Sequence, residues 1–360
     1  MESVTAATPK IPISLLTGFL GSGKTTVLNY LLRQPAMANV MVIINEFGEI
    51  GLDHELVESA TDDLVLLQSG CLCCTIRGDL IETLRTLYAR RSRGEIPAFN
   101  RVVIETIGLA DPAPILQAIM TDASVMRSFQ LDGVISTVDA VAGGATLDRH
   151  LEAVKQAAVA DRIMLTKTDL APDEVSKAAE QRLRALNPAA PIHRIAGGVV
   201  DPALLFDVGL YDPATKSLDV QRWLQDEKYA QAHSHGHERH GHDHQHGNAG
   251  NDSNRHDDHI RAISLVIDEP IPGETLDNWL KSLMQFRGPD LLRFKGIVNV
   301  AEMPGPIVLH GVQHVIYPPV VLKTWPSADR RTRMVFITYD IDEKTLRGSL
   351  DQLLREAAVS

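Results

Sequence analysis

The chain has 360 residues, a formal net charge of -11 and a hydrophobic fraction of 44%. The length predicts about two domains, and the charge argues against a nucleic-acid partner, because binding to phosphates needs clustered Lys and Arg. The sequence opens without a basic stretch before a long apolar run, and no window approaches the roughly 20 apolar residues of a membrane span, so we expect a cytoplasmic protein without a membrane partner.

Short apolar runs alternate with segments of helical periodicity from residue 11 to about residue 195. This alternation predicts an α/β domain with a mostly parallel sheet that helices cover on both faces. The expected strands are 11–17, 40–45, 64–68, 101–105, 131–138, 162–166 and 191–195, and the expected helices include 25–33, 79–91, 112–120 and 173–186.

A phosphate-binding loop follows the first expected strand. Residues 18–25 read Gly-Phe-Leu-Gly-Ser-Gly-Lys-Thr and match G-x-x-x-x-G-K-[ST] at every fixed position. Between a strand and a helix, the backbone N–H groups of such a loop surround phosphate oxygens. Lys24 would reach the β- and γ-phosphates as a catalytic cation, and the Thr25 hydroxyl would hold Mg²⁺. The expected nucleotide-binding residues here are Gly18, Gly21, Ser22, Gly23, Lys24, Thr25 and Thr26.

A carboxylate ends the expected strand 101–105. Glu105 would act with the Mg²⁺ ion as the second catalytic residue, through a bridging water because Glu is one methylene longer than the more common Asp. Gly108, three residues on, would let the backbone approach a γ-phosphate. The alternative for Glu105 is a carboxylate in a structural salt bridge.

Thr166-Lys-Thr-Asp169 at the end of the expected strand 162–166 indicates the base. The carboxylate of Asp169 can accept two hydrogen bonds from the ring N–H and exocyclic amine of guanine, whereas adenine lacks that pair of donors. Lys167 can lay its methylenes over the base. Thr166 stands where the usual guanine-binding tetrad has Asn, so one hydrogen bond differs, and we expect GTP in preference to ATP.

Every cysteine of the chain lies within four positions, at Cys71, Cys73 and Cys74. Three thiolates can bind Zn²⁺ or a similar transition metal, but a closed structural site needs four ligands. The site therefore takes a ligand that is not cysteine or stays open, and an open site can pass its metal on. Two alternatives are small buried hydrophobic residues and redox-sensing thiols.

The composition changes near residue 231. Nine of the residues from 233 to 259 are His, among Gly, Asp, Asn and Ser, so the segment cannot bury enough surface to offset its ordering entropy. We expect a disordered linker over 231–260, which either buffers metal ions or is only a solvated connection. It would separate a P-loop domain over 1–230 from a smaller α+β domain over 261–360, with strands 262–268, 292–299, 307–316 and 334–339 and helices 274–287 and 343–357.

The order of the P-loop, the stretch 45–53, the Gly-Cys-Leu-Cys-Cys element at 70–74 and Glu105-Thr-Ile-Gly108 resembles the CobW-like family of P-loop GTPases. The resemblance covers nearly the whole chain and implies a metallochaperone, with members linked to zinc or to cobalt. It also implies that the segment from residue 45 is a switch that rearranges with the nucleotide. Glu46 within it is a candidate metal ligand or nucleotide sensor, or only a surface carboxylate.

These observations together predict a GTP-hydrolysing metallochaperone. It would use GTP and Mg²⁺, bind Zn²⁺ (or Co²⁺) at the three cysteines, and transfer the metal to a client metalloprotein. The alternatives are a cobalt chaperone for cobalamin or nitrile hydratase-type enzymes, a non-catalytic metal buffer under nucleotide control, and a P-loop kinase or cofactor-synthesis enzyme. A homo-oligomer is left open.

Overall fold

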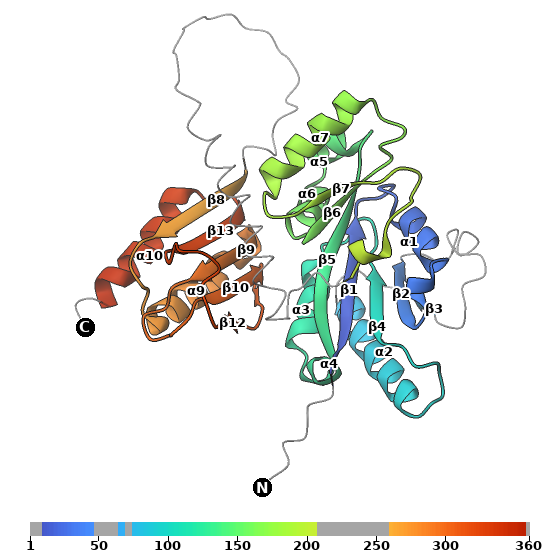
Figure 1. Ribbon diagram of the computed structural model, residues 1–360, viewed down its shortest axis with the longest axis horizontal. Coiled ribbons are helices and arrows are strands. Elements are labelled where there is room, and N and C mark those ends of the chain that lie inside the picture. Colours follow the sequence, from blue (N-terminus) through green and yellow to red (C-terminus); the bar gives the residue numbers. More distant parts are fainter. Residues whose placement is uncertain (1–8, 47–63, 69–73, 207–258, 358–360) are drawn as a thin grey trace, which may run out of the picture. The chain divides into compact units, whose positions relative to one another are not determined.

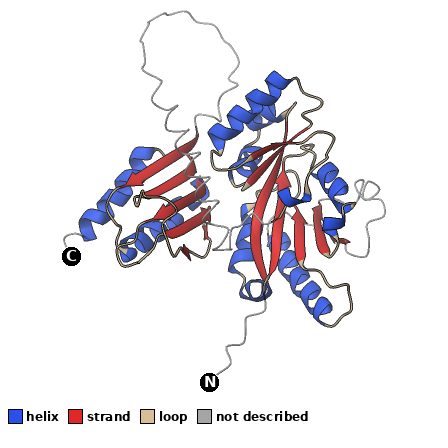
Figure 2. Ribbon diagram, in the orientation of Figure 1, coloured by secondary structure: helices blue, strands red, loops and turns tan. Residues whose placement is uncertain are grey.

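The computed structural model describes residues 9–46, 64–68, 74–206 and 259–357 (Figures 1 and 2). Contacts between residues divide the chain into two compact units. The first contains a seven-stranded sheet, and the second contains a six-stranded sheet. The segments 142–154 and 177–191 are grouped with the second unit, so the domain limits expected from the sequence stay predictions.

The first sheet has the strand order β3-β2-β4-β1-β5-β6-β7, and every neighbouring pair is parallel. This confirms the predicted parallel α/β sheet, because all seven expected strands are present with small shifts at their ends. The strands are β1 (Ile11–Gly18), β2 (Val40–Glu46), β3 (Leu64–Gln68), β4 (Arg101–Glu105), β5 (Phe129–Asp139), β6 (Arg162–Thr166) and β7 (Ile192–Arg194).

Helices pack on this sheet through apolar side chains. Helix α1 places Val27, Leu28 and Leu31 in a buried cluster with strand residues such as Val42 and Val103. Helices α2, α3 and α4 contact one another, and α3 and α4 also contact β5 (Figure 1). The helices up to residue 206 are α1 (Lys24–Leu32), η1 (Pro35–Met37), α2 (Cys74–Ser92), α3 (Ala113–Thr121), α4 (Ala123–Ser128), α5 (Gly143–Arg149), α6 (Leu151–Ala158), α7 (Asp173–Leu186) and η2 (Pro202–Leu204).

The second sheet is antiparallel, with the order β11-β10-β9-β13-β8 and β12 beside β10. Its core is mainly aliphatic and has three aromatic rings at its centre. The Trp279 ring meets Phe336 edge-on with centroids 5.8 Å apart, and Phe294 stacks on Phe336. This confirms the smaller α+β domain (Figure 2). Its elements are β8 (Ile260–Ile267), α9 (Gly273–Arg287), η3 (Gly288–Asp290), β9 (Leu291–Val298), β10 (Ile307–Val312), β11 (Val315–Ile316), β12 (Val320–Val321), β13 (Thr332–Tyr339) and α10 (Glu343–Ala357).

One predicted strand of this domain is wrong. The stretch 307–316 is a hairpin of β10 and β11, in which Val312 pairs with Val315 across a two-residue turn. Gln313 in the turn has a φ of 48°. The turn residues are Gln313 and His314. They are not one of the Asn-Gly or Asp-Gly pairs that mark a hairpin, so the sequence gives no clear sign of the reversal.

The predicted linker 231–260 lies outside the described residues except at its end, where His259 and Ile260 join the second sheet. The Asp340 N–H donates to the His259 carbonyl at 2.7 Å, and β8 begins at Ile260. Among the helices that the structure describes, none has the length and apolar character needed to cross a bilayer.

A carboxylate before β13 gives a test of this domain's stability. Arg331 donates through Nε and Nη2 to the two oxygens of Asp329, each at 3.0 Å, and these bonds from Arg331 lower the pKa of Asp329 from 3.8 to about 2. We expect Asp329→Asn to reduce the free energy of unfolding by about 1 kcal/mol near neutral pH, because solvent screens a partly exposed pair.

The sign of the shift sets the pH window of this effect. A lowered pKa in the folded state stabilises the protein above pH 3.8, and the contribution is lost as the pH falls towards about 2. Urea unfolding followed by tryptophan fluorescence should therefore show a difference between the wild type and Asp329→Asn that shrinks in acid. Asp277→Asn, which removes the exposed pair with Lys281, is the control, and an acid-independent difference for Asp329→Asn would contradict the assignment.

Candidate nucleotide and metal site

The phosphate-binding loop lies between β1 and α1, as the motif predicts. Gly18 ends the strand with a φ of 144°, and a Cβ there would be only 2.2 Å from Oγ1 of Thr137 and 2.5 Å from its carbonyl oxygen. Only glycine lets the loop leave the sheet this close to β5. Gly23, which has a φ of 93°, precedes the first helical residue, Lys24.

The Lys24 ammonium lies inside the loop. Its side chain is buried, and Nζ donates to the carbonyls of Gly18 at 2.8 Å and Phe19 at 3.2 Å. A buried charge needs such polar partners. The structure thus places a positive charge within the loop that the sequence predicts to bind phosphates.

Two hydroxyls from the sheet fix the loop at Ser22. The hydroxyls of Ser22 and Thr137 are 2.6 Å apart, and the Thr166 hydroxyl donates to the Ser22 carbonyl at 2.6 Å and to the Val138 carbonyl at 3.2 Å. Sequence reasoning missed Thr137, although it pairs with Gly18 in the register of β1 and β5. Thr166, which replaces the Asn of the usual tetrad, makes a loop contact with its hydroxyl.

The two residues predicted to hold Mg²⁺, Thr25 and Glu105, are in contact. The Thr25 hydroxyl donates to Oε1 of Glu105 at 3.3 Å, and Glu105 is buried at the end of β4. A hydroxyl and a carboxylate supply the oxygen ligands that Mg²⁺ prefers, so the pair fits this ion. The side chains come together because Glu105 pairs with Leu16 of β1, just before the loop.

A buried glutamine holds the loop that follows Glu105. Gln156 of α6 donates through Nε2 to the carbonyls of Gly108 at 3.0 Å and Ala110 at 2.9 Å, and Lys155 forms an ion pair with Asp111 at 2.8 Å. A Cβ on Gly108 would lie 2.7 Å from the backbone of Leu20. Gly108 therefore lies against the phosphate-binding loop, and its approach to a γ-phosphate stays a prediction.

The predicted base-binding residues lie on the loop after β6. The Lys167 ammonium pairs with Asp139 at 2.6 Å, and Oδ1 of Asp169 accepts the Gly197 N–H at 3.0 Å. A Cβ on Gly198 would lie 2.7 Å from the methyl group of Thr26. The loop after β7 therefore lies next to the residues predicted to bind the nucleotide. The sequence did not indicate this role, because a Gly-Gly pair predicts only a turn.

The predicted metal ligands are only partly within the described chain. Cys71 and Cys73 lie outside the described residues, Cys74 is the first residue of α2, and Glu46 is the last residue of β2. In the parallel register of β2 and β3, Glu46 pairs with Gln68. Cys71 follows Gln68 by three residues in the sequence, and a common metal site of the thiols and Glu46 stays a prediction. Within the described ranges, no group of three His, Cys, Asp or Glu forms a metal site.

Residues 12–194 match the nucleotide-binding domain of the CobW/HypB/UreG family, and residues 260–354 match the C-terminal domain of the cobalamin synthesis protein CobW. The chain belongs to the CobW/HypB/UreG family. The first match spans the phosphate-binding loop and all seven strands up to the end of β7, and the second match spans nearly all of the six-stranded domain.

Relatives of this CobW family member include named zinc chaperones. The zinc chaperone YjiA of Escherichia coli is 30% identical over 94% of this chain and 97% of its own length. The zinc chaperone CobW of a Sinorhizobium species is 29% identical over 98% of this chain and 100% of its own. The zinc-regulated GTPase metalloprotein activator 1 of Dictyostelium discoideum is 27% identical over 91% of this chain and 76% of its own.

Solved structures of YjiA also resemble the whole CobW-type chain. The zinc-bound YjiA GTPase from E. coli has a TM-score of 0.70 and 25% identity, with 96% of this chain and 99% of that one covered. A zinc-bound triple mutant of YjiA, with one glutamate and two cysteines changed to alanine, gives a TM-score of 0.70, 26% identity and the same coverage.

The contact between Gly108 and Leu20 gives a test of this site. Gly108→Ala places a methyl group against backbone atoms that cannot move without distorting the phosphate-binding loop, so we expect a loss of about 1–3 kcal/mol of stability and weaker GDP binding. Gly144→Ala is the control, because a Cβ there meets no atom within 4 Å. Thermal unfolding and fluorescent GDP titration measure both effects, and equal behaviour of the two variants would contradict the close contact.

Proposed function

We propose that this chain is a GTPase that binds Zn²⁺ at Cys71, Cys73 and Cys74 and transfers it to a client metalloprotein. The observation that carries the proposal is the hydrogen bond between Thr25 and Glu105 beneath the phosphate-binding loop, one strand away from the β2–β3 edge where the thiol segment begins. The family and the named zinc chaperones among its relatives support the same function.

The nucleotide half of the proposal uses the loop and its neighbours. The backbone N–H groups and Lys24 would bind the β- and γ-phosphates, while Thr25 and Glu105 would hold Mg²⁺, which neutralises charge on the transferred phosphoryl group. The hydrogen bonds from Gln156 to the carbonyls of Gly108 and Ala110 hold the loop after Glu105 in place. A water molecule would attack the γ-phosphate and yield GDP and phosphate.

The base-binding part of the proposal depends on Asp169. Its carboxylate is oriented by the Gly197 N–H and would accept the two N–H donors of guanine. Lys167, whose ammonium is held by Asp139, would cover one face of the base with its methylenes. These two residues favour GTP over ATP.

Zinc is the cargo of this reaction. Three thiolates and the Glu46 carboxylate supply four ligands of the types that Zn²⁺ accepts, and the same set would suit Co²⁺. Ile44 pairs with Glu105 in the register of β2 and β4. Loss of the γ-phosphate would shift Glu105, and this shift would be transmitted along β2 from Ile44 to Glu46, two residues further on. Hydrolysis would then alter zinc affinity, and a client metalloprotein would receive the ion, in the cytoplasm as the sequence predicts.

Zinc-dependent turnover tests this proposal. We expect Zn²⁺ to change the GTP turnover of the wild type, while a variant with the three cysteines replaced by Ser loses the response. Thr25→Ala should reduce turnover by about 100-fold with or without zinc, because Mg²⁺ contributes several kcal/mol to transition-state stabilisation. Phosphate release at fixed Mg²⁺ and increasing Zn²⁺ is the measurement.

Matched controls separate the two halves of the function. Glu46→Gln should weaken the zinc response, whereas Glu95→Gln, which alters a surface carboxylate paired with Arg93, should not. Turnover that is undetectable under every metal condition would reject the GTPase. An identical zinc response in the wild type and the cysteine variant would reject the thiol site and leave the GTPase standing.

Base preference provides a second test, through Asp169→Asn. An Asn amide can donate to the carbonyl that xanthine carries where guanine has its amine, so the variant should lose GDP affinity by about 100-fold or more and gain affinity for xanthosine diphosphate. Asp201→Asn is the matched control, because Asp201 also accepts one backbone N–H, that of Ala203 at 2.9 Å. Competition against a fluorescent nucleotide measures the affinities, and an unchanged guanine preference would contradict the role of Asp169.

A further inference from the structure

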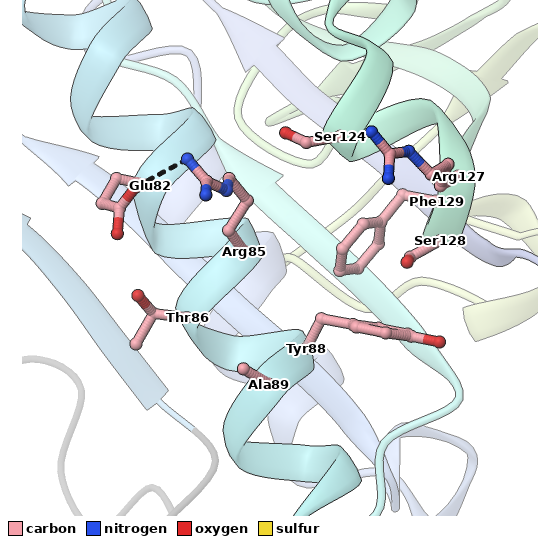
Figure 3. Close-up of a pocket in the computed structure, with 9 residues that line it drawn as sticks. All are labelled: Glu82, Arg85, Thr86, Tyr88, Ala89, Ser124, Arg127, Ser128 and Phe129. Atoms are coloured by element: carbon pink, nitrogen blue, oxygen red, sulfur yellow. Dashed lines mark hydrogen bonds and ion pairs between the residues drawn. The ribbon is translucent and has the colours of Figure 1, made fainter.

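A groove lies between α2 and α4, on residues that the nucleotide and thiol chemistry do not use (Figure 3). Its volume is about 480 Å³, which is in the range of sites for small molecules. Arg85 and Tyr88 come from α2, Ser124 and Arg127 from α4, and Phe129 from the start of β5. Arg85 lies about three helical turns after Cys74, the first residue of α2.

Two guanidinium groups lie at the rim of this groove (Figure 3). Arg127 uses Nε to donate to the Ala123 carbonyl at 3.2 Å, which leaves both of its terminal amino groups without a partner in the described part of the chain. Arg85 pairs with Glu82 at 3.2 Å, and both side chains are more than half exposed. An exposed pair of this kind contributes little stability, so a ligand can take the place of Glu82.

A second acidic side chain, Asp122, lies two residues before the groove residue Ser124. Asp122 caps α4, and it accepts the backbone N–H groups of Ser124 and Val125 and the Ser124 hydroxyl. Its negative charge is therefore directed to the start of the helix. The donors of Arg127 remain available to an anion.

Aromatic side chains line the space below the arginines. The ring of Tyr88 meets that of Phe129 edge-on, with centroids 5.9 Å apart and planes at 67°, and Figure 3 shows both rings beneath the guanidinium groups. Aromatic faces and edges offer apolar contact to a flat ligand body, and two arginine forks suit a carboxylate or phosphate group.

We propose that this groove binds a small organic anion, a phosphate monoester or carboxylate on an aromatic body. The anionic group lies between Arg85 and Arg127, and the aromatic body lies on the half-buried ring of Tyr88, which packs against the buried Phe129. The site is separate from the phosphate-binding loop, since none of its lining residues belongs to that loop, and it is independent of the function proposed above.

Fluorine NMR with para-fluorophenyl phosphate tests the site. The full chain is first saturated with GDP and Mg²⁺, so that the phosphate-binding loop is filled. We expect the wild type to bind the probe with a Kd of about 1 mM and Arg127→Gln to bind it about tenfold more weakly. Arg127→Lys, which keeps the charge and loses the fork, should give an intermediate value.

Controls make the result specific. Arg93→Gln removes an arginine that pairs with Glu95 outside the groove and should bind like the wild type, and GDP affinity reports that each variant is folded. para-Fluorobenzoate distinguishes carboxylates from phosphates as the preferred group, and binding of either one supports the site. Equal binding by Arg127→Gln and the wild type, or equal binding of the uncharged para-fluorobenzyl alcohol, overturns the proposal.

Discussion

The structure depends on how the sheet holds Ser22 in the phosphate-binding loop. Thr137 of β5 contacts its hydroxyl, and Thr166 of β6 donates to its carbonyl. Because the sheet holds both groups, the loop is restrained before a ligand binds, and less conformational entropy is lost on binding. The start of α1 and the buried ammonium of Lys24 follow from that shape.

Parallel pairing brings the other chemical groups to the same edge. Parallel strands end together, so Gly18, Glu46, Glu105 and Asp139 all stand at the carboxyl ends of neighbouring strands, where open α/β sheets bind ligands. The register of β4 and β1 pairs Glu105 with Leu16, which brings the carboxylate next to Thr25. The register of β2 and β3 pairs Glu46 with Gln68, the last residue of β3.

Thr166 stands where the usual guanine-binding tetrad has Asn, and it still fixes the position of the phosphate-binding loop. Its hydroxyl bridges Ser22 and Val138, and this links the base-side loop to the phosphate-binding loop. Asp169 then receives its orientation from Gly197. The phosphate-binding loop and the segment predicted to bind the base therefore contact each other directly.

The sequence by itself determined the phosphate-binding loop and the order of strands and helices in the first sheet, because glycine spacing and apolar runs act on neighbouring residues. It placed Glu105 at the end of a strand, but the hydrogen bond with Thr25, 80 positions away, needed the pairing of β4 with β1. It did not indicate Thr137 or Gln156, since a lone Thr in a strand or Gln in a helix has no local signal. Their contacts join residues 115 and 48 positions apart. The groove beside Arg127 was decided in the same way, because it lies between α2 and α4. Such contacts form only when distant segments pack, and packing geometry is not written in any local pattern.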